Sequence, residues 1–465
     1  MPLAERLLFN AKFKVMQKAK NNKQPKGLSI QIINQNAAGI DVGDMLLSVA
    51  VPPDRDDIQV KEFGAFTDDL HSIAHWLKKC NIETVAMECT GVYWKNIYTV
   101  LIQYGFEVCL VNARHTRNVS GRKTDEKDAQ WIQRLHTCGL LNSCFLPDDL
   151  TQTVRTLVRQ RRSLTQDSTR YILRLQKSLE MMNIKLHAVI SNITGKTGTA
   201  IIQAIIAGER NPENFLLLVR KGIKADKDTL LKSLQANWRI EQLFLLEQSY
   251  RMYQFTQQEI KHCEKQIEQA LQTFIAANND GIIEQVTPLQ RPKPTTKNKL
   301  SFGAHSYLHK IHGVDVTAIY GISEIAALEI LAETGTNLSK WPTENHFVSW
   351  LNLCPNNKIS GGKLISSQML KKKPNIASQA FRYGANTLQR SDHWLGDYFR
   401  RMKAKGGNKY AIVAASRKLA IIYYKMVRFK QSFQPFDNDE YKQKFQRAKI
   451  AYLERALLRL KSEVA

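Results

Sequence analysis

The sequence lacks any apolar run close to the roughly 20 residues that a membrane-spanning helix needs. Residues 1–26 are basic but contain neither the apolar core nor the small-residue cleavage site of a secretory signal peptide. The seven cysteines are scattered, odd in number and form no CxxC pair, which argues against a disulfide framework or a zinc finger. These absences exclude a membrane protein and a secreted mini-protein, and they favour a reducing compartment.

Acidic residues are also scarce, because 42 Asp and Glu stand against 67 Lys and Arg, for a net charge of +25. With 465 residues, 43% of them hydrophobic, the chain is long enough for about two to four domains with proper cores. The charge is uneven: residues 1–36 carry a net +6, residues 37–147 a net −3, and the remainder +22. A basic body around an acidic module is typical of a protein that binds phosphate backbones and holds metal ions.

The acidic module alternates between short apolar runs and segments with helical periodicity. The runs expected to form strands are 37–43, 45–51, 58–66, 84–87 and 106–111, and the segments expected to form helices are 67–80, 92–104 and 124–138. The order βββαβαβα is that of the ribonuclease-H-like fold, a mixed sheet flanked by helices. The fold class we predict is therefore multidomain α/β plus α.

The rest of the chain favours helices. Apolar residues recur at three- and four-residue steps over 150–189, and a second long helical stretch covers about 228–274, so the two could form an antiparallel coiled-coil arm or a subunit contact. We expect a linker or insertion over 276–310, a mostly helical domain over 311–430 and a basic amphipathic helix over 441–460. On the first long helix we assign nucleic-acid contact to five arginines, since only Asp167 opposes them along the helix: Arg155, Arg159, Arg162, Arg170 and Arg174.

Four carboxylates occupy special places in the acidic module. Asp41 and Glu88 each end an expected strand, while Asp125 and Asp128 are spaced i,i+3 at the start of the last helix and therefore share a helical face. Clustered carboxylate oxygens suit Mg²⁺, and two such ions about 4 Å apart can stabilise both the attacking and the leaving oxygen of a phosphoryl transfer. Singly, each acid has a simpler reading, such as a favourable charge in a first helical turn or a turn residue beside glycine.

Ser360 precedes Gly361 and Gly362 in a polar loop that is rich in lysine and lacks acids. The loop is either a flexible surface turn or a serine hydroxyl presented as a nucleophile, which would need a base or a metal for activation. Nucleic-acid contact is assigned to its lysines, which are Lys358, Lys363, Lys371, Lys372 and Lys373. Upstream, Gly321 lies in a turn before the helix 324–334 and could present backbone N–H groups to a phosphate in a helix-hairpin-helix manner, or simply join two helices.

These motifs together resemble the DEDD transposases of the insertion sequence 110 family, with the subgroup typified by insertion sequence 1111 most similar. The resemblance covers roughly residues 37–430. It is carried by GIDVG around Asp41, AMECTGVYW around Glu88, KTDEKDA around Asp125 and Asp128, GVDVTAIYGISEIAALEILAETG at 313–335 and SWLNLCPNNKISGGKL at 349–364.

The resemblance implies a transposase or recombinase that cleaves and rejoins DNA strands. Asp41, Glu88, Asp125 and Asp128 would bind Mg²⁺, as two ions, in a RuvC-like domain, and Ser360 would form a transient phosphoserine link to DNA. It also implies a guide (bridge) RNA encoded by the element, pairing with donor and target DNA, a homo-oligomer between dimer and tetramer, and a cytoplasmic, nucleoid-associated bacterial protein. None of the RNA guidance or assembly follows from residue spacing.

The predicted division of the chain has six parts. They are a basic arm (1–36), the RuvC-like DEDD catalytic domain (37–147), coiled-coil helices (148–275), a linker or insertion (276–310), a transposase domain with the catalytic serine (311–430) and a basic C-terminal helix (431–465). Two other functions stay open at this stage. GIDVG also resembles the phosphate loop of actin-like ATPases and sugar kinases, and a non-enzymatic nucleic-acid scaffold would show the same charge.

Overall fold

The computed structural model describes residues 32–89, 91–112, 128–278, 298–370 and 375–464. The chain divides into two compact units, residues 1–146 and 147–465. Predictions for Asp125, for the lysines at 371–373 and for most of the basic arm lie outside the described residues. No helix in the described ranges has a stretch that is both long and apolar enough to cross a membrane.

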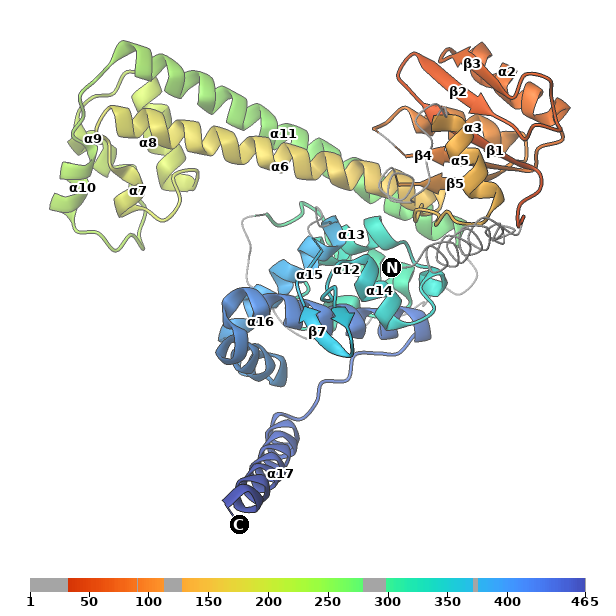
Figure 1. The fold of residues 1–465 in the computed structure, drawn as a ribbon. Helices are drawn as coiled ribbons and strands as arrows, with labels where there is room; N and C mark the ends of the chain where they lie inside the picture. The colour runs from red at the N-terminus through yellow and green to blue at the C-terminus, as the bar shows by residue number, and fades with distance from the viewer. Residues whose placement is uncertain (1–31, 90, 113–127, 279–297, 371–374, 465) are drawn as a thin grey trace, which may run out of the picture. The chain divides into compact units, whose positions relative to one another are not determined.

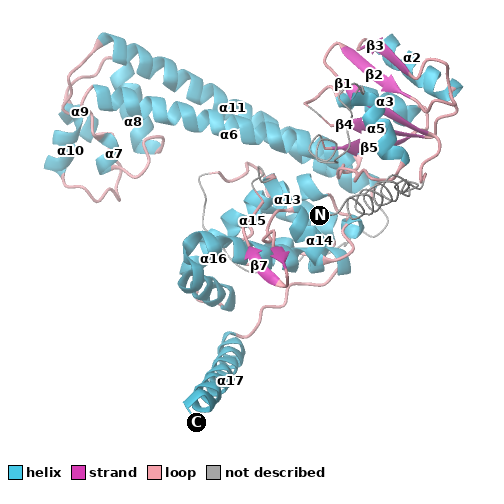
Figure 2. Ribbon diagram, in the orientation of Figure 1, coloured by secondary structure: helices cyan, strands magenta, loops and turns pink. Residues whose placement is uncertain are grey.

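The first unit contains a five-stranded mixed sheet with the strand order β3-β2-β1-β4-β5 (Figures 1 and 2). Its strands are β1 (Ala37–Val42), β2 (Leu46–Ala50), β3 (Val60–Gly64), β4 (Thr84–Glu88) and β5 (Glu107–Val111). Its helices in the described ranges are α2 (Thr67–Lys79), α3 (Trp94–Gln103) and α5 (Asp128–Thr137). The first three strands form an antiparallel meander, and β4 and β5 run parallel to β1. The mixed α/β sheet domain and its predicted element order are confirmed.

The two faces of this sheet are covered by different helices. Apolar residues that alternate along the strands, such as Ile40 and Met87, pack with Ile73 of α2 and Leu101 of α3 in one core. Helix α5 lies on the opposite face, where a Cβ on Gly39 would stand 2.4 Å from the backbone of the helix. Glycine at this position therefore lets α5 approach β1 closely.

The second unit begins with two long helices, α6 (Asp149–Met181) and α11 (Ile240–Ala277), which lie side by side (Figure 1). They run antiparallel, because Cys263 contacts the carbonyl of Leu157 while the earlier Gln257 bonds the later Ser168. At the middle of this pair the buried Arg161 Nε lies 2.7 Å from Oε1 of the buried Glu264.

Both long helices are shorter than the sequence pattern predicted. The prediction of one helix over 150–189 is wrong, because α6 ends at Met181 and Asn183 takes a left-handed φ of 63° that breaks the helix. The prediction over 228–274 is also wrong, because α11 starts only at Ile240. Between them lie α7 (Leu186–Val189), α8 (Lys196–Ile206), α9 (Pro212–Leu216) and α10 (Lys227–Leu234), which enclose a small core of their own.

The remainder of the second unit is mostly helical, as predicted. Its helices are α12 (Ala304–His312), α13 (Glu324–Thr334), α14 (Glu344–Trp350), α15 (Ile376–Thr387), α16 (Trp394–Phe429) and α17 (Asn438–Val464), with short 3₁₀ turns η1 (Val316–Ala318), η2 (Leu338–Lys340) and η3 (Leu388–Arg390). A hairpin of β6 (Lys358–Ser360) and β7 (Lys363–Ser366) projects from it. Large buried aromatics, among them Phe347, Phe381 and Tyr423, form its core.

The predicted linker over 276–310 is wrong at its end. Residues 304–310 belong to α12, which buries three histidines on one face, His305, His309 and His312. The sequence around these residues is rich in Pro and Lys and suggested a linker. The helix forms because it buries its histidine face. The pKa of His312 falls to about 3 because burial disfavours the charged ring, so this side chain is a neutral core residue.

Candidate active site

Asp41 and Glu88 end neighbouring strands of the sheet in the first unit. Strands β1 and β4 pair in parallel from Ala37 opposite Thr84 to Ile40 opposite Met87, and the next pair in this register is Asp41 with Glu88. Paired residues of adjacent strands project from the same face of a sheet. Both carboxylates therefore share the face that carries α5, as the sequence predicted for adjacent strand ends.

Helix α5, which packs on this face, begins at a third predicted ligand. Asp128 is the first described residue of α5, and its neighbour Ala129 has its carbonyl oxygen 2.4 Å from where a Cβ of Gly39 would stand. Gly39 lies two residues before Asp41 on β1 and on the same face. The end of α5 is fixed by the hydrogen bond of 2.9 Å between His136 Nε2 and Thr84 Oγ1, and burial lowers the pKa of His136.

One polar side chain beside these acids was not predicted. Ser48 of β2 stands opposite Asp41 in the antiparallel register, and its Oγ is buried without a hydrogen-bond partner among the described atoms. The sequence could have indicated Ser48, because it is a serine inside the apolar run 45–51 and a short turn joins that run to the strand of Asp41. Buried polar atoms are normally satisfied, so this hydroxyl is an unusual feature of the strand beside Asp41.

The donor set at this edge fits a hard divalent cation such as Mg²⁺, which takes carboxylate and hydroxyl oxygens. The described residues alone do not complete such a site, since no three His, Cys, Asp or Glu side chains among them are grouped to hold a metal ion. Asp125, the fourth predicted ligand, lies outside these residues.

Ser360 ends strand β6 at the tip of an exposed two-residue hairpin. It pairs with Lys363, and the turn between them consists of Gly361 and Gly362, whose φ angles of 54° and 74° are both left-handed. Two successive left-handed residues are what a type I′ hairpin turn needs, and glycine adopts them without strain. The predicted polar loop is thus an ordered hairpin that presents the Ser360 hydroxyl to solvent, with Lys358 and Lys363 on its two strands.

Two family models match this chain. One, for DEDD transposases of the IS110 type and described as a transposase, matches residues 38–184. The other, described as "Transposase IS116/IS110/IS902 family", matches residues 315–400, so that the two together cover half of the chain. The chain belongs to the IS110 family of transposases. No curated protein matches the sequence at a significant level.

The two matched segments contain the residues that the sequence predicts as catalytic. Asp41, Glu88 and Asp128 lie in the first segment, and Ser360 lies in the second. The protein is therefore a DNA transposase whose substrate is DNA.

Three of the arginines for which nucleic-acid contact is predicted join α6 to α13 in the transposase. Arg155 Nη2 lies 2.6 Å and Arg159 Nε 2.9 Å from the carboxylate of Glu333, which is 1% exposed. Arg162 Nη1 lies 3.2 Å from Oε1 of Glu329. The sequence shows only which acids lie on the same helix as the arginines, whereas these two glutamates belong to α13. The three guanidinium groups are thus engaged within the chain, although the Arg159 side chain is still 50% exposed. Arg170 and Arg174 are also exposed on α6, and Arg170 Nη1 lies 2.6 Å from Oδ1 of Asp167.

Glu333 should make the stability of the transposase depend on pH. Burial opposes its ionisation, but the hydrogen bonds from Arg159 and Arg155 outweigh burial and hold the pKa of Glu333 below its ordinary 4.5. A lowered pKa stabilises the fold at pH values above the unfolded pKa, and this contribution is lost as the pH falls through the folded pKa.

We expect Glu333→Gln to lower the free energy of unfolding by about 3 kcal/mol or more at pH 7, because two guanidinium groups lose their counter-ion. The difference from the unsubstituted protein should shrink below about pH 4.5. Urea unfolding at pH 7 and at pH 4 measures both values. Glu247→Gln, which removes only the exposed pair with Arg251 at 3.9 Å, is the control; an equal loss in the control, or a loss that does not depend on pH, would contradict the assignment.

Gly321 also has a structural reason to be glycine. Its φ is 84°, and a Cβ there would stand 2.5 Å from the carbonyl oxygen of Gly384 in α15. The close approach of this turn to α15 is sufficient to require glycine at this position, whether or not the turn also binds a phosphate. Helix α13 then begins at Glu324 with the Ser323 hydroxyl accepting from the Ala326 N–H, as the sequence indicated.

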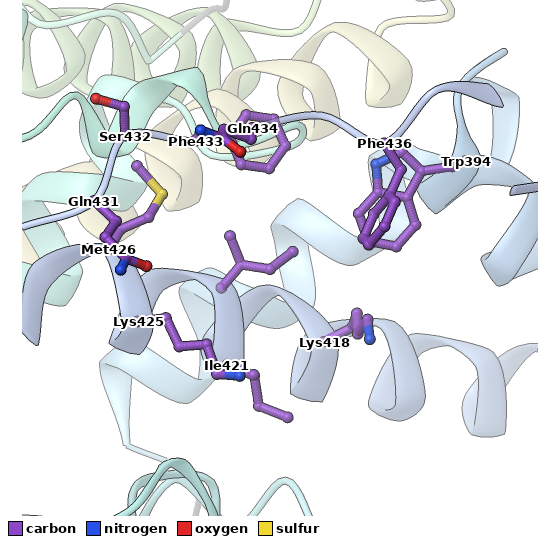
Figure 3. Close-up of a pocket in the computed structure, with 11 residues that line it drawn as sticks. Trp394, Lys418, Ile421, Lys425, Met426, Gln431, Ser432, Phe433, Gln434 and Phe436 are labelled. Carbon is purple, nitrogen blue, oxygen red and sulfur yellow. The ribbon is translucent and has the colours of Figure 1, made fainter. Parts of the chain in front are cut away.

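A separate cavity of about 750 Å³ lies between α16 and residues 431–436 (Figure 3). Lys418 and Lys425 of α16 line one side, and the aromatic rings of Trp394, Phe433 and Phe436 line the other. Burial lowers the pKa of Lys418. Lysines that face aromatic rings are typical of single-strand nucleic-acid sites, although neither Ser360 nor the predicted metal ligands line this cavity.

Proposed function

We propose that this transposase is an RNA-guided recombinase that cleaves and rejoins DNA through a divalent-metal site and a serine nucleophile. The observation that supports the proposal is the parallel register of β1 and β4, which runs to Ile40 opposite Met87, one residue before Asp41 and Glu88, on a sheet that packs against α5 at Gly39. This arrangement supports a RuvC-like site in which the four predicted acids hold Mg²⁺. The metal ions would neutralise charge that develops on the attacking and leaving oxygens.

Ser360 supplies the nucleophile in this proposal. Its Oγ attacks the phosphorus of a DNA phosphodiester and gives up its proton, and the departing DNA oxygen takes a proton to become a free hydroxyl. The phosphorus is then bonded to Ser360 instead of to the departed DNA oxygen. A hydroxyl of another DNA strand can attack this phosphorus in turn, which rejoins the DNA and frees Ser360. The hairpin tip supports this role because the hydroxyl is exposed between Lys358 and Lys363, which can bind the flanking phosphates.

Ser360 needs activation in this proposal, because an isolated serine hydroxyl is a weak nucleophile. We propose that the Mg²⁺ held by the acids activates it when DNA is bound.

Helix α17 supports an association between copies. Its residues Ile450, Leu453, Leu457 and Leu460 follow a 3-4-3 spacing, and each is more than half exposed. This is the a/d pattern of a coiled coil, and Lys449 and Glu454 would then occupy g and e positions that attract each other across a parallel pair. We propose that α17 pairs with α17 of a second copy within a dimer or tetramer.

Replacing Leu453 and Leu457 together with glutamate should halve the molar mass of the particle if it is a dimer, since four charges would enter one apolar seam. Size-exclusion chromatography with light scattering measures the mass. Ser462→Glu, at an f position that points away from the seam, should leave the mass unchanged. An unaltered mass in the double variant would show that α17 does not hold the copies together.

RNA guidance rests on the family resemblance and on the net charge of +25. Exposed Arg170 and Arg174, the hairpin lysines and the cavity beside Lys418 and Lys425 are the surfaces that we propose for RNA and DNA backbones. The lysines at 371–373 extend this set outside the described residues.

One experiment tests the proposal as a whole. The full chain is purified with its co-purifying RNA, which is sequenced, and then incubated with Mg²⁺ and DNA that contains the sites to which this RNA can pair. We expect a discrete RNA, strand cleavage that EDTA abolishes, and a protein–DNA adduct whose phosphopeptide maps to Ser360. Binding of DNA without cleavage would favour a scaffold, and cleavage without RNA would remove the guide.

A further inference from the structure

Two cysteine thiols face each other next to Glu88 in the first unit. The Sγ atoms of Cys89 and Cys144 are 3.6 Å apart, although 55 positions separate them in the sequence. Cys89 directly follows strand β4, and Cys144 lies in the segment after α5. Neither thiol has a role in the DNA chemistry proposed above.

The backbone holds this pair in place. The N–H of Cys89 donates to the carbonyl of Val111 at 3.0 Å, and the N–H of Cys144 donates to the carbonyl of Leu110 at 2.6 Å. Both cysteines are therefore anchored to consecutive residues of β5. The two sulfur atoms must approach by only about 1.5 Å to reach the disulfide length of about 2.05 Å, which side-chain rotation can supply.

We propose that Cys89 and Cys144 form a redox-sensitive dithiol that closes to a disulfide when a peroxide oxidises the protein. One thiolate attacks a peroxide oxygen, which gives a sulfenic acid and releases water after protonation. The second thiol then attacks the sulfenic sulfur, the S–S bond forms and a second water leaves. Two electrons pass from the two sulfur atoms to one peroxide molecule, which is reduced to two waters when the peroxide is hydrogen peroxide.

Geometry separates this pair from the other cysteines. All seven cysteines are free thiols in the structure, and Cys89 with Cys144 is the pair whose sulfur atoms are in contact among the described residues. Cys109 of β5 also lies near, because Ser143 bonds its thiol. Cys80, Cys138, Cys263 and Cys354 lie elsewhere in the chain. The bond would join the end of β4 to the segment after α5.

The test uses the full-length protein and hydrogen peroxide. We expect the mass to fall by about 2 Da, free thiols titrated after denaturation to fall from seven to five, and peptide mapping to recover Cys89 joined to Cys144. The thermal midpoint should rise by on the order of 5 °C, because the bond restricts the unfolded chain, and dithiothreitol should reverse both changes.

Two single variants give the controls. Cys144→Ser should keep its mass under the same treatment or form only sulfenic and higher acids on Cys89, and Cys354→Ser should still lose 2 Da. The unsubstituted protein would overturn the proposal if it kept all seven thiols at peroxide concentrations that oxidise a small dithiol, or if mapping placed the bond between Cys109 and either partner.

Discussion

Replacing Asp41 with asparagine is expected to lower Mg²⁺-dependent DNA cleavage by more than about 100-fold while the protein stays folded. Losing even an outer partner of a metal ligand costs 10- to 100-fold in metal affinity or activity, and we propose Asp41 as a direct ligand. Asparagine keeps the size and shape of the side chain but removes its charge, so the packing of β1 against α5 should survive. Cleavage of labelled DNA over a Mg²⁺ titration, with circular dichroism on the same sample, measures both effects.

A matched control for this variant lies three residues away. Asp44→Asn changes the same residue type in the turn after β1, where Asp44 is exposed and its Oδ1 only accepts from the N–H of Met45. Its cleavage rate should stay within about twofold of the unsubstituted protein, as is usual for exposed positions. Equal rates for the two variants would remove Asp41 from the metal site.

Replacing Ser360 with alanine is expected to abolish the covalent protein–DNA adduct and strand cleavage together. Loss of the nucleophile costs a serine hydrolase on the order of 10⁶ in turnover, which would place the adduct below detection. The side chain is exposed at a hairpin tip, so its removal should not change stability. Denaturing gels with labelled DNA detect the adduct, and filter binding of labelled RNA shows whether nucleic-acid binding persists.

Ser366→Ala is the control for this second prediction, because Ser366 stands on β7 of the same hairpin opposite Lys358. We expect its adduct to form at the normal yield. If Ser360→Ala still formed an adduct that maps to another hydroxyl, the hairpin would be a binding element and the nucleophile would lie elsewhere. If the adduct vanished while EDTA-sensitive cleavage continued, water rather than Ser360 would attack the phosphorus.

The first unit was predictable because its order is local. Alternating apolar residues decide which face of a strand is buried, and short polar turns decide that β1, β2 and β3 form a meander. Asp41 and Glu88 could be assigned to strand ends for the same reason. The pairing of Asp41 with Ser48 needed the exact register, which the pattern alone does not give.

The second unit was less predictable because distant partners decide its details. Apolar periodicity continues past Met181, yet the left-handed Asn183 ends α6 and a small core of short helices follows. The arginines of α6 show the same limit. A sequence shows which acids lie near Arg155 along the helix, but not that Glu333 comes from α13 to neutralise it.

The sequence by itself determined the charge division, the element order of the acidic module and the motifs that identify the transposase family. Each of these depends on neighbouring residues or on composition, and both can be read along one chain. Only the tertiary structure decided that Gly321 packs closely against Gly384 and that Cys89 meets Cys144. Those contacts join residues that are far apart in the sequence. They form only when the chain packs into its folded structure, so the sequence pattern does not show them.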